Sequence, residues 1–409
     1  MIGIEEATEI VLSKIRDWGV EDLPLEKAFG RLLREPLIAD RDFPPYTRVT
    51  MDGIAIAYSA FASGQRQFPI EGLQAAGSPQ KTLQNPDHCL EVMTGAVLPK
   101  GTDTVIPYEE VRIKEGVAEV IPNEFKQGKN AHLQGLNRKR GEVIVPSGKW
   151  ISAAELGVAA TVGKSFLAVA ALPKVCVITT GDELVEVDAV PLPHQIRKSN
   201  AYTIQALLRE EGIEADLYHM ADKPEEIRLV LNSCLDKYDV LVLSGGVSKG
   251  KLDFVPEALA TLGVEKLFHR VSQRPGKPFW FGESQERNTV VFALPGNPVS
   301  SFMCTCRYLK PYLRRSLGLS ATNPLSACLA EDFSFAPSLT YFLQVRLEYT
   351  QDGRVLAYPV AGKGSGDLAN LCDAQAFLEL PADRTDFFKG ECFPCWPYVS
   401  PERVFSQKL

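Results

Sequence analysis

The chain has 409 residues, 45% of them hydrophobic and 23% charged, which is the composition of a folded soluble protein. Its formal net charge of −7 and its lack of a long basic run argue against general nucleic-acid binding. No apolar stretch approaches the roughly 20 residues of a membrane span, and the acidic N-terminus lacks the apolar core of a signal peptide. We therefore expect a cytoplasmic protein without a membrane anchor, and its length predicts two to four domains.

The nine cysteines are an odd number scattered along a long chain. This pattern favours reduced thiols over a disulfide framework. Cys392 and Cys395 form a single CxxC pair without a partner pair or nearby histidines, so we interpret them as structural or incidental rather than metal-binding.

The N-terminal part of the chain mixes helical and extended patterns. Apolar residues recur at helical spacing over residues 4–19, and an alanine-rich segment over 152–162 predicts a second, short helix. Between them, from about residue 50 to 140, short alternating pieces are separated by glycine and proline. That part of the sequence predicts a small β domain.

From residue 173 to about 318 the pattern changes to alternating strand and helix. Glycines at 212 and 263 follow two of the expected helices, as helix C-caps do. The expected helices cover residues 202–211, 224–237, 255–262 and 298–317. This pattern predicts an open, mostly parallel α/β sheet. Short strands over 340–349, 355–360 and 376–380 then predict a small C-terminal β domain.

Three apolar runs of the α/β segment each lead into a polar loop that contains glycine. They cover residues 175–178, 240–243 and 290–294. Continuous apolar runs are typical of strands buried on both faces of a parallel sheet. Because ligands bind outside the carboxyl ends of such strands, we expect the three loops to face one pocket.

The loops of this pocket contain groups that suit an anion. Ser244, Gly245 and Gly246, with Ser248 and Gly250 beyond them, provide hydroxyls and free backbone N–H groups, although a tight strand–helix turn is the alternative interpretation. Arg274 and Lys277 flank a Pro-Gly pair, and an incidental surface charge is the alternative there. Asn297 and Pro298 are expected at the N-cap and first position of a helix, where anions bind favourably.

Carboxylates accompany these anion-binding elements. They are Asp182, Glu183, Asp222 and Asp253. Carboxylates beside phosphate-binding groups would repel the ligand unless a magnesium ion (Mg2+) bridges them. A solvated loop charge is the alternative for any one of them alone.

Elsewhere the sequence is less specific. Asp52 precedes a glycine among apolar residues, where an acid also serves to cap a turn. The basic cluster at residues 138–140 is interpreted as a solvated face. The five histidines show no ligand spacing, so a zinc site or a Ser-His triad is not expected.

Taken in order, these segments resemble the molybdopterin molybdenumtransferase family, known as MoeA, and the related E domain of gephyrin. The matching pieces span nearly the whole chain: Met51-Asp52-Gly53-Ile54-Ala55, Met93-Thr94-Gly95-Ala96 with Pro99 and Gly101, Thr180-Gly181-Asp182-Glu183-Leu184, Ser199-Asn200, Ser244-Gly245-Gly246-Val247-Ser248, Pro275-Gly276-Lys277-Pro278, Leu294-Pro295-Gly296-Asn297-Pro298-Val299-Ser300, and Gly364-Ser365-Gly366. Each piece alone is weak, but the ordered set is specific.

The resemblance implies a homodimer of elongated four-domain subunits, with the active site between the α/β domain of one subunit and the N-terminal domains of the other. We accordingly expect a discontinuous mixed α/β domain (1–45 and 140–171), an inserted β domain (46–139), an α/β domain of the molybdopterin-binding type (172–320) and a β-barrel-like C-terminal domain (321–409). The implied reaction joins molybdate to adenylylated molybdopterin with Mg2+ and releases AMP.

The resemblance also implies roles for individual residues. Asp52, Thr94 and Glu183 would lie near the molybdate and metal, while Asp222 and Asp253 would organise Mg2+ or the pterin and nucleotide. The implied catalytic residues are Asp52, Thr94, Glu183 and Glu142, and the implied metal ligands are Asp52, Glu183, Asp222 and Asp253. The implied substrate- and phosphate-binding residues are Gly181, Asp182, Ser199, Asn200, Asp222, Ser244, Gly245, Gly246, Ser248, Arg270, Arg274, Lys277, Pro295, Asn297, Pro298 and Ser365.

The chain departs from the family pattern in three places. Gly141-Glu142-Val143 stands where the family usually has Gly-Glu-Asp, so either Glu142 substitutes for the missing aspartate or the metal site differs. Arg270 and Arg274 stand where the family has lysines, which keeps the charge but not the geometry. Residues 46–50 replace the usual Asn-Ser approach to Asp52. These changes predict a divergent, active branch.

Two other functions fit the sequence less well. A non-catalytic scaffold of the gephyrin type lacks support, because the chain shows no linker or fused domain. A different pterin- or nucleotide-processing enzyme would have a related α/β domain, but it would lack β domains at both ends.

Overall fold

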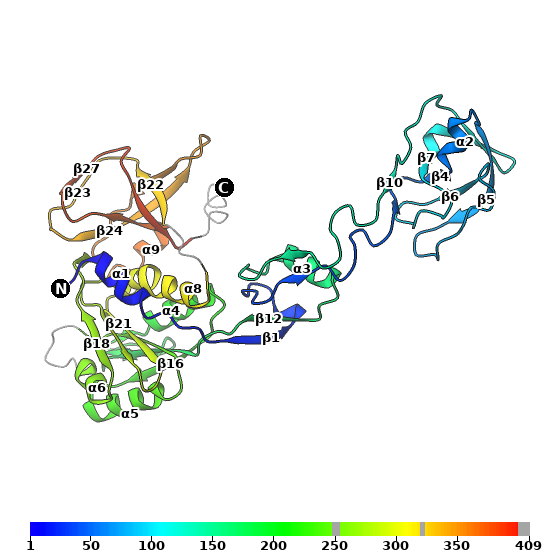
Figure 1. Ribbon diagram of the computed structural model, residues 1–409. Coiled ribbons are helices and arrows are strands. Elements are labelled where there is room, and N and C mark those ends of the chain that lie inside the picture. Colours follow the sequence, from blue (N-terminus) through cyan, green and yellow to red (C-terminus); the bar gives the residue numbers. More distant parts are fainter. Residues whose placement is uncertain (248–253, 320–323, 400–409) are drawn as a thin grey trace. The chain divides into compact units, whose positions relative to one another are not determined.

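The computed structural model describes residues 1–247, 254–319 and 324–399, and Figure 1 shows the elements that they form. The chain divides into two compact units. The first contains Met1–Glu21 and Ala170–Leu409, and the second contains Asp22–Val169. Among the described residues, no helix combines the length and the apolar character that crossing a membrane requires.

The first unit is built on a six-stranded sheet of order β16-β13-β17-β21-β20-β18. The first four strands are parallel and the last two are antiparallel, which confirms the mostly parallel sheet. Their bounds are β13 (Val175–Thr180), β16 (Ala215–Met220), β17 (Val240–Ser244), β18 (Glu265–His269), β20 (Trp280–Ser284) and β21 (Thr289–Leu294).

Helices cover both faces of this sheet. Because successive strand residues point to opposite faces, each face has its own apolar side chains to bury. Val175 and Val177 of β13 pack in one core cluster with α1, α4, α7 and α8, whereas Cys176 and Ile178 pack in another with α5 and α6. In Figure 1 these two sets of helices lie on opposite sides of the strands. The helices are α1 (Ile4–Leu12), α4 (Asn200–Arg209), α5 (Pro224–Leu235), α6 (Val255–Thr261), α7 (Pro298–Cys304) and α8 (Lys310–Ser316).

Two predicted helices differ from the structure. The helix expected over residues 4–19 ends at Leu12, and the chain beyond it places Trp18 edge-on against Tyr312. The helix expected over 298–317 is interrupted by a π-helical turn, η3 (Thr305–Leu309). Pro311 explains the interruption, because proline lacks an N–H and its ring crowds the carbonyl of Arg307, four residues earlier.

The C-terminal part of the first unit is a closed barrel of five strands. Its order is β24-β25-β22-β28-β26, and β26 pairs back onto β24. Prediction and structure agree on its three expected strands within one residue. The strands are β22 (Leu325–Leu329), β24 (Thr340–Tyr349), β25 (Val355–Pro359), β26 (Ala376–Leu380) and β28 (Cys392–Pro397). Smaller elements of this unit are β14 (Leu184–Val185), β15 (Ile196–Arg197), β19 (Gln273–Arg274), β23 (Phe333–Ser334), β27 (Asp386–Phe387) and α9 (Asn370–Asp373).

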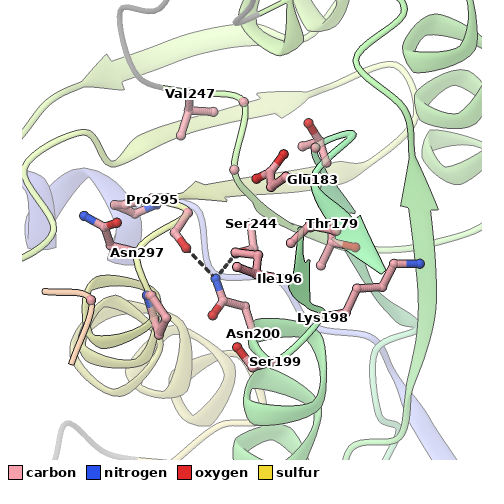
Figure 2. Close-up of a pocket in the computed structure, with 18 of the residues that line it drawn as sticks. Thr179, Glu183, Ile196, Lys198, Ser199, Asn200, Ser244, Val247, Pro295 and Asn297 are labelled. Atoms are coloured by element: carbon pink, nitrogen blue, oxygen red, sulfur yellow. Dashed lines mark hydrogen bonds between the residues drawn. The ribbon is translucent and has the colours of Figure 1, made fainter. Parts of the chain in front are cut away.

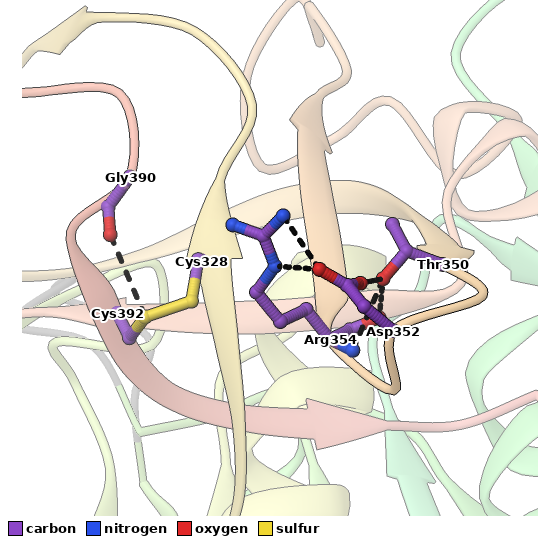
Figure 3. The surroundings of a disulfide bond; sticks show 6 residues. All are labelled: Cys328, Thr350, Asp352, Arg354, Gly390 and Cys392. Atoms are coloured by element: carbon purple, nitrogen blue, oxygen red, sulfur yellow. Dashed lines mark hydrogen bonds and ion pairs between the residues drawn. A yellow bond between two sulfur atoms is a disulfide. The ribbon is translucent and has the colours of Figure 1, made fainter.

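The barrel contains one disulfide, between Cys328 and Cys392 (Figure 3). The two residues lie 64 positions apart in sequence but directly opposite each other on β22 and β28. The prediction of reduced thiols is therefore wrong for this pair, because strand pairing brings together two cysteines that sequence spacing does not connect. The other seven cysteines are free, including Cys395 of the CxxC pair, which is buried.

The second unit contains a six-stranded sheet of order β7-β4-β6-β5-β9-β8 with α2 packed in its core. A smaller core beside α3 gathers residues from both ends of this segment, including Leu37 and Val145. The elements are β1 (Val20–Pro24), η1 (Leu25–Lys27), β2 (Leu37–Ile38), β3 (Arg48–Val49), β4 (Gly53–Ile56), α2 (Tyr58–Ala62), β5 (Gln67–Gln74), β6 (Cys89–Val92), β7 (Thr104–Pro107), η2 (Tyr108–Glu110), β8 (Val111–Lys114), β9 (Val117–Val120), β10 (Ala131–His132), β11 (Val143–Val145), α3 (Ala153–Thr161) and β12 (Phe166–Ala170). The helix expected over 152–162 is α3, and its N-cap Ser152 forms a capping box with Glu155.

Candidate functional site

A cavity of the first unit lies at the carboxyl ends of β13, β17 and β21 (Figure 2). Its volume is about 700 Å³, and residues from all three strand-end loops line it. The prediction that these loops face one pocket is confirmed. We call this cavity the acidic pocket, because Glu183 and Asp222 are among its lining residues. The described lining residues assigned from sequence are Gly181, Glu183, Ser199, Asn200, Asp222, Ser244, Gly245, Gly246, Pro295, Asn297 and Pro298.

Two adjacent glycines shape the floor of the acidic pocket. Gly245 and Gly246 have φ values of 103° and 69°, which side chains rarely adopt. A Cβ on Gly246 would lie 2.7 Å from a methyl group of Val255, and one on Gly245 would lie 3.0 Å from the carbonyl oxygen of Thr180. The glycine pair therefore lets the β17 loop lie directly against the end of β13.

Asn200 connects the loop after β17 to the loop after β21. Its side-chain amide donates to the Ser244 hydroxyl at 2.8 Å and to the Gly296 carbonyl at 2.7 Å. Figure 2 shows both bonds converging on Asn200 at the start of α4. One side chain thus fixes the β17 loop relative to the β21 loop.

Asn297 and Pro298 occupy the N-cap and first-turn positions of α7 that the sequence predicts. The Asn297 side chain forms no cap bond, however. Its amide donates instead to the Ser365 hydroxyl at 2.8 Å, which ties the α/β domain to the loop before α9.

The carboxylates are held by the ends of β13 and β16. Asp222 accepts a hydrogen bond from the Thr180 hydroxyl at 2.7 Å, and Asp182 accepts one from the backbone N–H of Asp222 at 3.2 Å. Asp182 does not line the cavity. Within the described residues, no three His, Cys, Asp or Glu side chains lie close enough to hold a metal. Asp253 and Ser248 lie outside the described residues.

The two cations of the Arg-Pro-Gly-Lys segment line a different cavity. This second cavity, of about 310 Å³, lies between the α/β domain and the barrel, and we call it the cationic pocket. Arg274, Lys277 and Ser365 line it, and its described lining includes no carboxylate. Pro278, Pro295 and Asn297 line both pockets, so the two cavities share a wall. Arg270, which was assigned to phosphate from sequence, lines neither pocket.

Sequence reasoning missed the two basic residues that line the acidic pocket, Arg197 and Lys198. The Lys198 ammonium pairs with Glu186 at 2.5 Å, and its side chain is only 11% exposed. This pairing lowers the pKa of the exposed Glu186 carboxyl. The sequence contains a signal for them, because these two basic residues directly precede Ser199 and Asn200, which the sequence assigns to substrate binding.

Behind the acidic pocket, His219 contacts Thr179 at 3.2 Å between Nδ1 and the hydroxyl. Burial lowers the pKa of His219, and the nearby Lys198 ammonium lowers it further. The imidazole is therefore neutral near pH 7.

Models of three families match successive parts of the chain. The MoeA N-terminal region (domain I and II) matches residues 2–163, a probable molybdopterin binding domain matches 176–315, and the MoeA C-terminal region (domain IV) matches 326–398. A Synechocystis protein named molybdopterin molybdenumtransferase is 40% identical over 97% of this chain and all of its own length. A Staphylococcus epidermidis protein of the same name is 30% identical, covering 95% of this chain and 94% of its own. The chain belongs to the MoeA family.

The fold agrees with that membership. A crystal structure described as molybdopterin biosynthesis MoeA protein from Pyrococcus horikosii superposes with a TM-score of 0.84 and 28% identity. The match covers 98% of this chain and all of the other. The family relationship therefore extends over both units of the chain.

In this MoeA-family chain, Asp52 and Thr94 come together in the second unit. One Asp52 carboxylate oxygen accepts from the Thr94 backbone N–H at 2.6 Å and from its hydroxyl at 2.8 Å. These two bonds, the backbone one first, lower the pKa of the exposed Asp52 carboxyl. Because Thr94 lies 42 residues away, Asp52 does more than cap its own turn.

The chain departs from the family pattern at Val143, the first residue of β11 in the second unit. Glu142 directly precedes this strand. Glu142 is exposed, and its carbonyl accepts from the backbone N–H of Ala39 at 2.9 Å. Val143 is 53% exposed and pairs with Ile38. Glu142 is thus sterically available at the surface, and its catalytic role stays a prediction.

Proposed function

We propose that this MoeA-family protein is a molybdopterin molybdenumtransferase that joins molybdate to adenylylated molybdopterin and releases AMP. The observation that supports this most is the pair of adjoining pockets, one lined by both carboxylates and basic residues and the other, in its described lining, by basic residues without a carboxylate. A reaction between a nucleotide-linked pterin and a free oxyanion needs two neighbouring sites with different electrostatics. The shared wall of Pro278, Pro295 and Asn297 keeps such sites next to each other.

We assign the phosphate end of the adenylylated substrate to the acidic pocket. The Gly246 N–H and the Ser244 hydroxyl suit phosphate oxygens, whereas the Gly245 N–H donates to the Leu294 carbonyl at 3.1 Å. Glu183 and Asp222 are hard oxygen donors of the kind that Mg2+ prefers. When bound, that ion would neutralise charge on the phosphates and on the leaving AMP. Lys198, whose ammonium is paired with Glu186, also lines this pocket.

We assign molybdate to the cationic pocket. Arg274 and Lys277 are exposed there, and without a carboxylate in the described lining an oxyanion needs no bridging metal. Arg offers paired donors to a tetrahedral oxyanion and Lys offers a compact charge. In this proposal Arg274 and Lys277 bind molybdate in the cationic pocket, and the phosphate of the other substrate binds in the adjoining acidic pocket.

We further propose a cytoplasmic homodimer in which Asp52 and Thr94 of one subunit complete the site of the other. The lowered pKa of Asp52 keeps its carboxylate charged and suited to a metal or to a developing positive charge. Sedimentation tests the dimer directly, and a stable active monomer would contradict it.

The experiment that tests the function uses purified protein, adenylylated molybdopterin, Mg2+ and molybdate. We expect AMP release that exceeds the release without protein and depends on molybdate. Omission of Mg2+ should abolish it. AMP release no faster than in the control without protein would overturn the proposal.

A further inference from the structure

The turn that carries both cations of the cationic pocket, residues 273–278, is held from inside by one buried side chain. The Gln273 amide nitrogen donates to the Gly276 carbonyl at 3.0 Å across the turn. Its amide oxygen accepts from the Tyr308 hydroxyl at 2.5 Å. Gln273 is fully buried and Tyr308 is 1% exposed, so water does not replace either bond.

Backbone bonds support the base of this turn, where β19 also pairs with β24 of the barrel. Val271 N–H donates to the Lys277 carbonyl at 3.0 Å and closes the base of the turn. Gly276, at the tip, has φ of 89°, and a Cβ there would lie 2.8 Å from Cys304 Sγ and 2.8 Å from the end of Met303. The tip is therefore pressed against α7, and the Gln273 amide fills the space beneath it.

The second partner comes from the π-helical turn η3. Tyr308 lies within η3, between α7 and the Pro311-bearing α8. Cys304 and Tyr308 are four residues apart, a spacing that places both side chains on one face of the helical segment. The same segment therefore presses Cys304 against the turn and offers the Tyr308 hydroxyl to Gln273.

The cations themselves have few other restraints. Arg274 and Lys277 are exposed, and within the described residues neither forms an ion pair. The Arg274 guanidinium lies 5.8 Å from the ring centre of Phe335, at the outer range of a cation–π contact. The position of their charges is therefore set mainly by the backbone of the turn.

We infer that Gln273 and Tyr308 are positioning residues that hold Arg274 and Lys277 in the geometry that an oxyanion requires. The inference rests on the proposed function only in its assignment of molybdate to the cationic pocket. Neither residue needs to touch the ligand. If the two bonds served stability alone, an apolar side chain of similar size would replace Gln273 without effect on the ligand. If they position the turn, that replacement frees the Gly276 carbonyl and weakens oxyanion binding.

The test is calorimetric titration of molybdate into full-length protein without any pterin. We expect Gln273→Met and Tyr308→Phe each to raise the Kd for molybdate about tenfold, equivalent to about 1.4 kcal/mol. The matched control is Thr305→Val in the same helical segment, which removes a buried bond to the Ser301 carbonyl but does not touch the turn. That control should lower the melting temperature without changing the Kd.

Combining the two changes distinguishes a shared role from two separate ones. Because both residues act through the same turn, Gln273→Met/Tyr308→Phe should bind molybdate about as weakly as Gln273→Met alone. In turnover, the KM for molybdate should rise while the KM for adenylylated molybdopterin stays unchanged.

Two results would overturn the inference, and they are distinguishable. Wild-type binding of molybdate in the Gln273→Met and Tyr308→Phe variants would show that the bonds are only structural. No measurable binding to wild-type protein, or binding unaffected by Lys277→Met, would instead overturn the assignment of molybdate to this pocket and, with it, the role of Gln273.

Discussion

The two pockets of the first unit share a wall but differ in how their charges are built. In the acidic pocket the groups come from strand ends, and Thr180 and Asn200 fix them through bonds within the α/β domain. In the cationic pocket the charges lie on a turn whose support comes from buried residues beneath it. The difference suggests that the strand-end pocket is rigid by topology, whereas the cationic pocket depends on a few side-chain contacts. Each of the following changes tests one side of this contrast.

The largest effect is expected from an acid that lies in neither pocket. Asp52→Asn should abolish turnover, with a loss of at least about 100-fold, because the amide cannot carry the charge that Asp52 keeps. The Thr94 bonds are partly retained, so the melting temperature should change little. Steady-state AMP release and calorimetry check this. The Asp52→Asn variant should still bind AMP and molybdate. Normal turnover of this variant would contradict the proposed role of Asp52 in the reaction.

Within the acidic pocket, Glu183→Gln should lower kcat/KM by about 100-fold or more, since it removes a lining carboxylate that would bind the metal of the proposed reaction. The Kd for molybdate should not change. Glu225→Gln provides the control, because Glu225 is an exposed carboxylate in the first turn of α5 that does not line the pocket. Equal losses in the two variants would mean that general acidity, not the position of Glu183, matters.

Within the cationic pocket, Lys277→Met should raise the Kd for molybdate about 10- to 100-fold while leaving the Kd for AMP with Mg2+ unchanged. Lys389→Met removes an exposed lysine of the barrel and should change neither value. The contrast between the pockets would fail if Lys277→Met weakened AMP binding as much as molybdate binding.

The smallest effect concerns stability. The pKa of His219 is lowered mainly by burial, so the unfolded chain binds a proton more readily than the folded one. Stability from this group is complete above the ordinary histidine pKa of about 6.5 and is lost as pH falls below it. His219→Gln should therefore show a smaller drop in melting temperature from pH 7.5 to 5.5 than wild type. An identical drop would assign the acid sensitivity to other groups.

Local patterns predicted the framework of both pockets. Continuous apolar runs identified β13, β17 and β21, and the Asn297-Pro298 pair identified the start of α7, because these signals depend on neighbouring residues alone. The cations and most acids followed from loop composition. The division into four domains and the functional roles of individual residues stay predictions.

Contacts between distant residues could not be read from the sequence. Gln273 and Tyr308 lie 35 positions apart, and neither belongs to a recognisable pattern. Cys328 and Cys392 meet only because β22 pairs with β28. The separation of Arg274 and Lys277 from Glu183 is likewise a property of the folded chain, since all three follow strands of the same segment.

Competition between AMP and molybdate tests the central claim, two adjoining but separate pockets, most directly. Molybdate would be titrated calorimetrically into the protein alone and into the protein saturated with AMP and Mg2+. We predict that both ligands bind together and that the Kd for molybdate differs by less than about twofold between the two titrations. Displacement of molybdate by AMP, with the Kd rising in proportion to AMP concentration, would contradict the account.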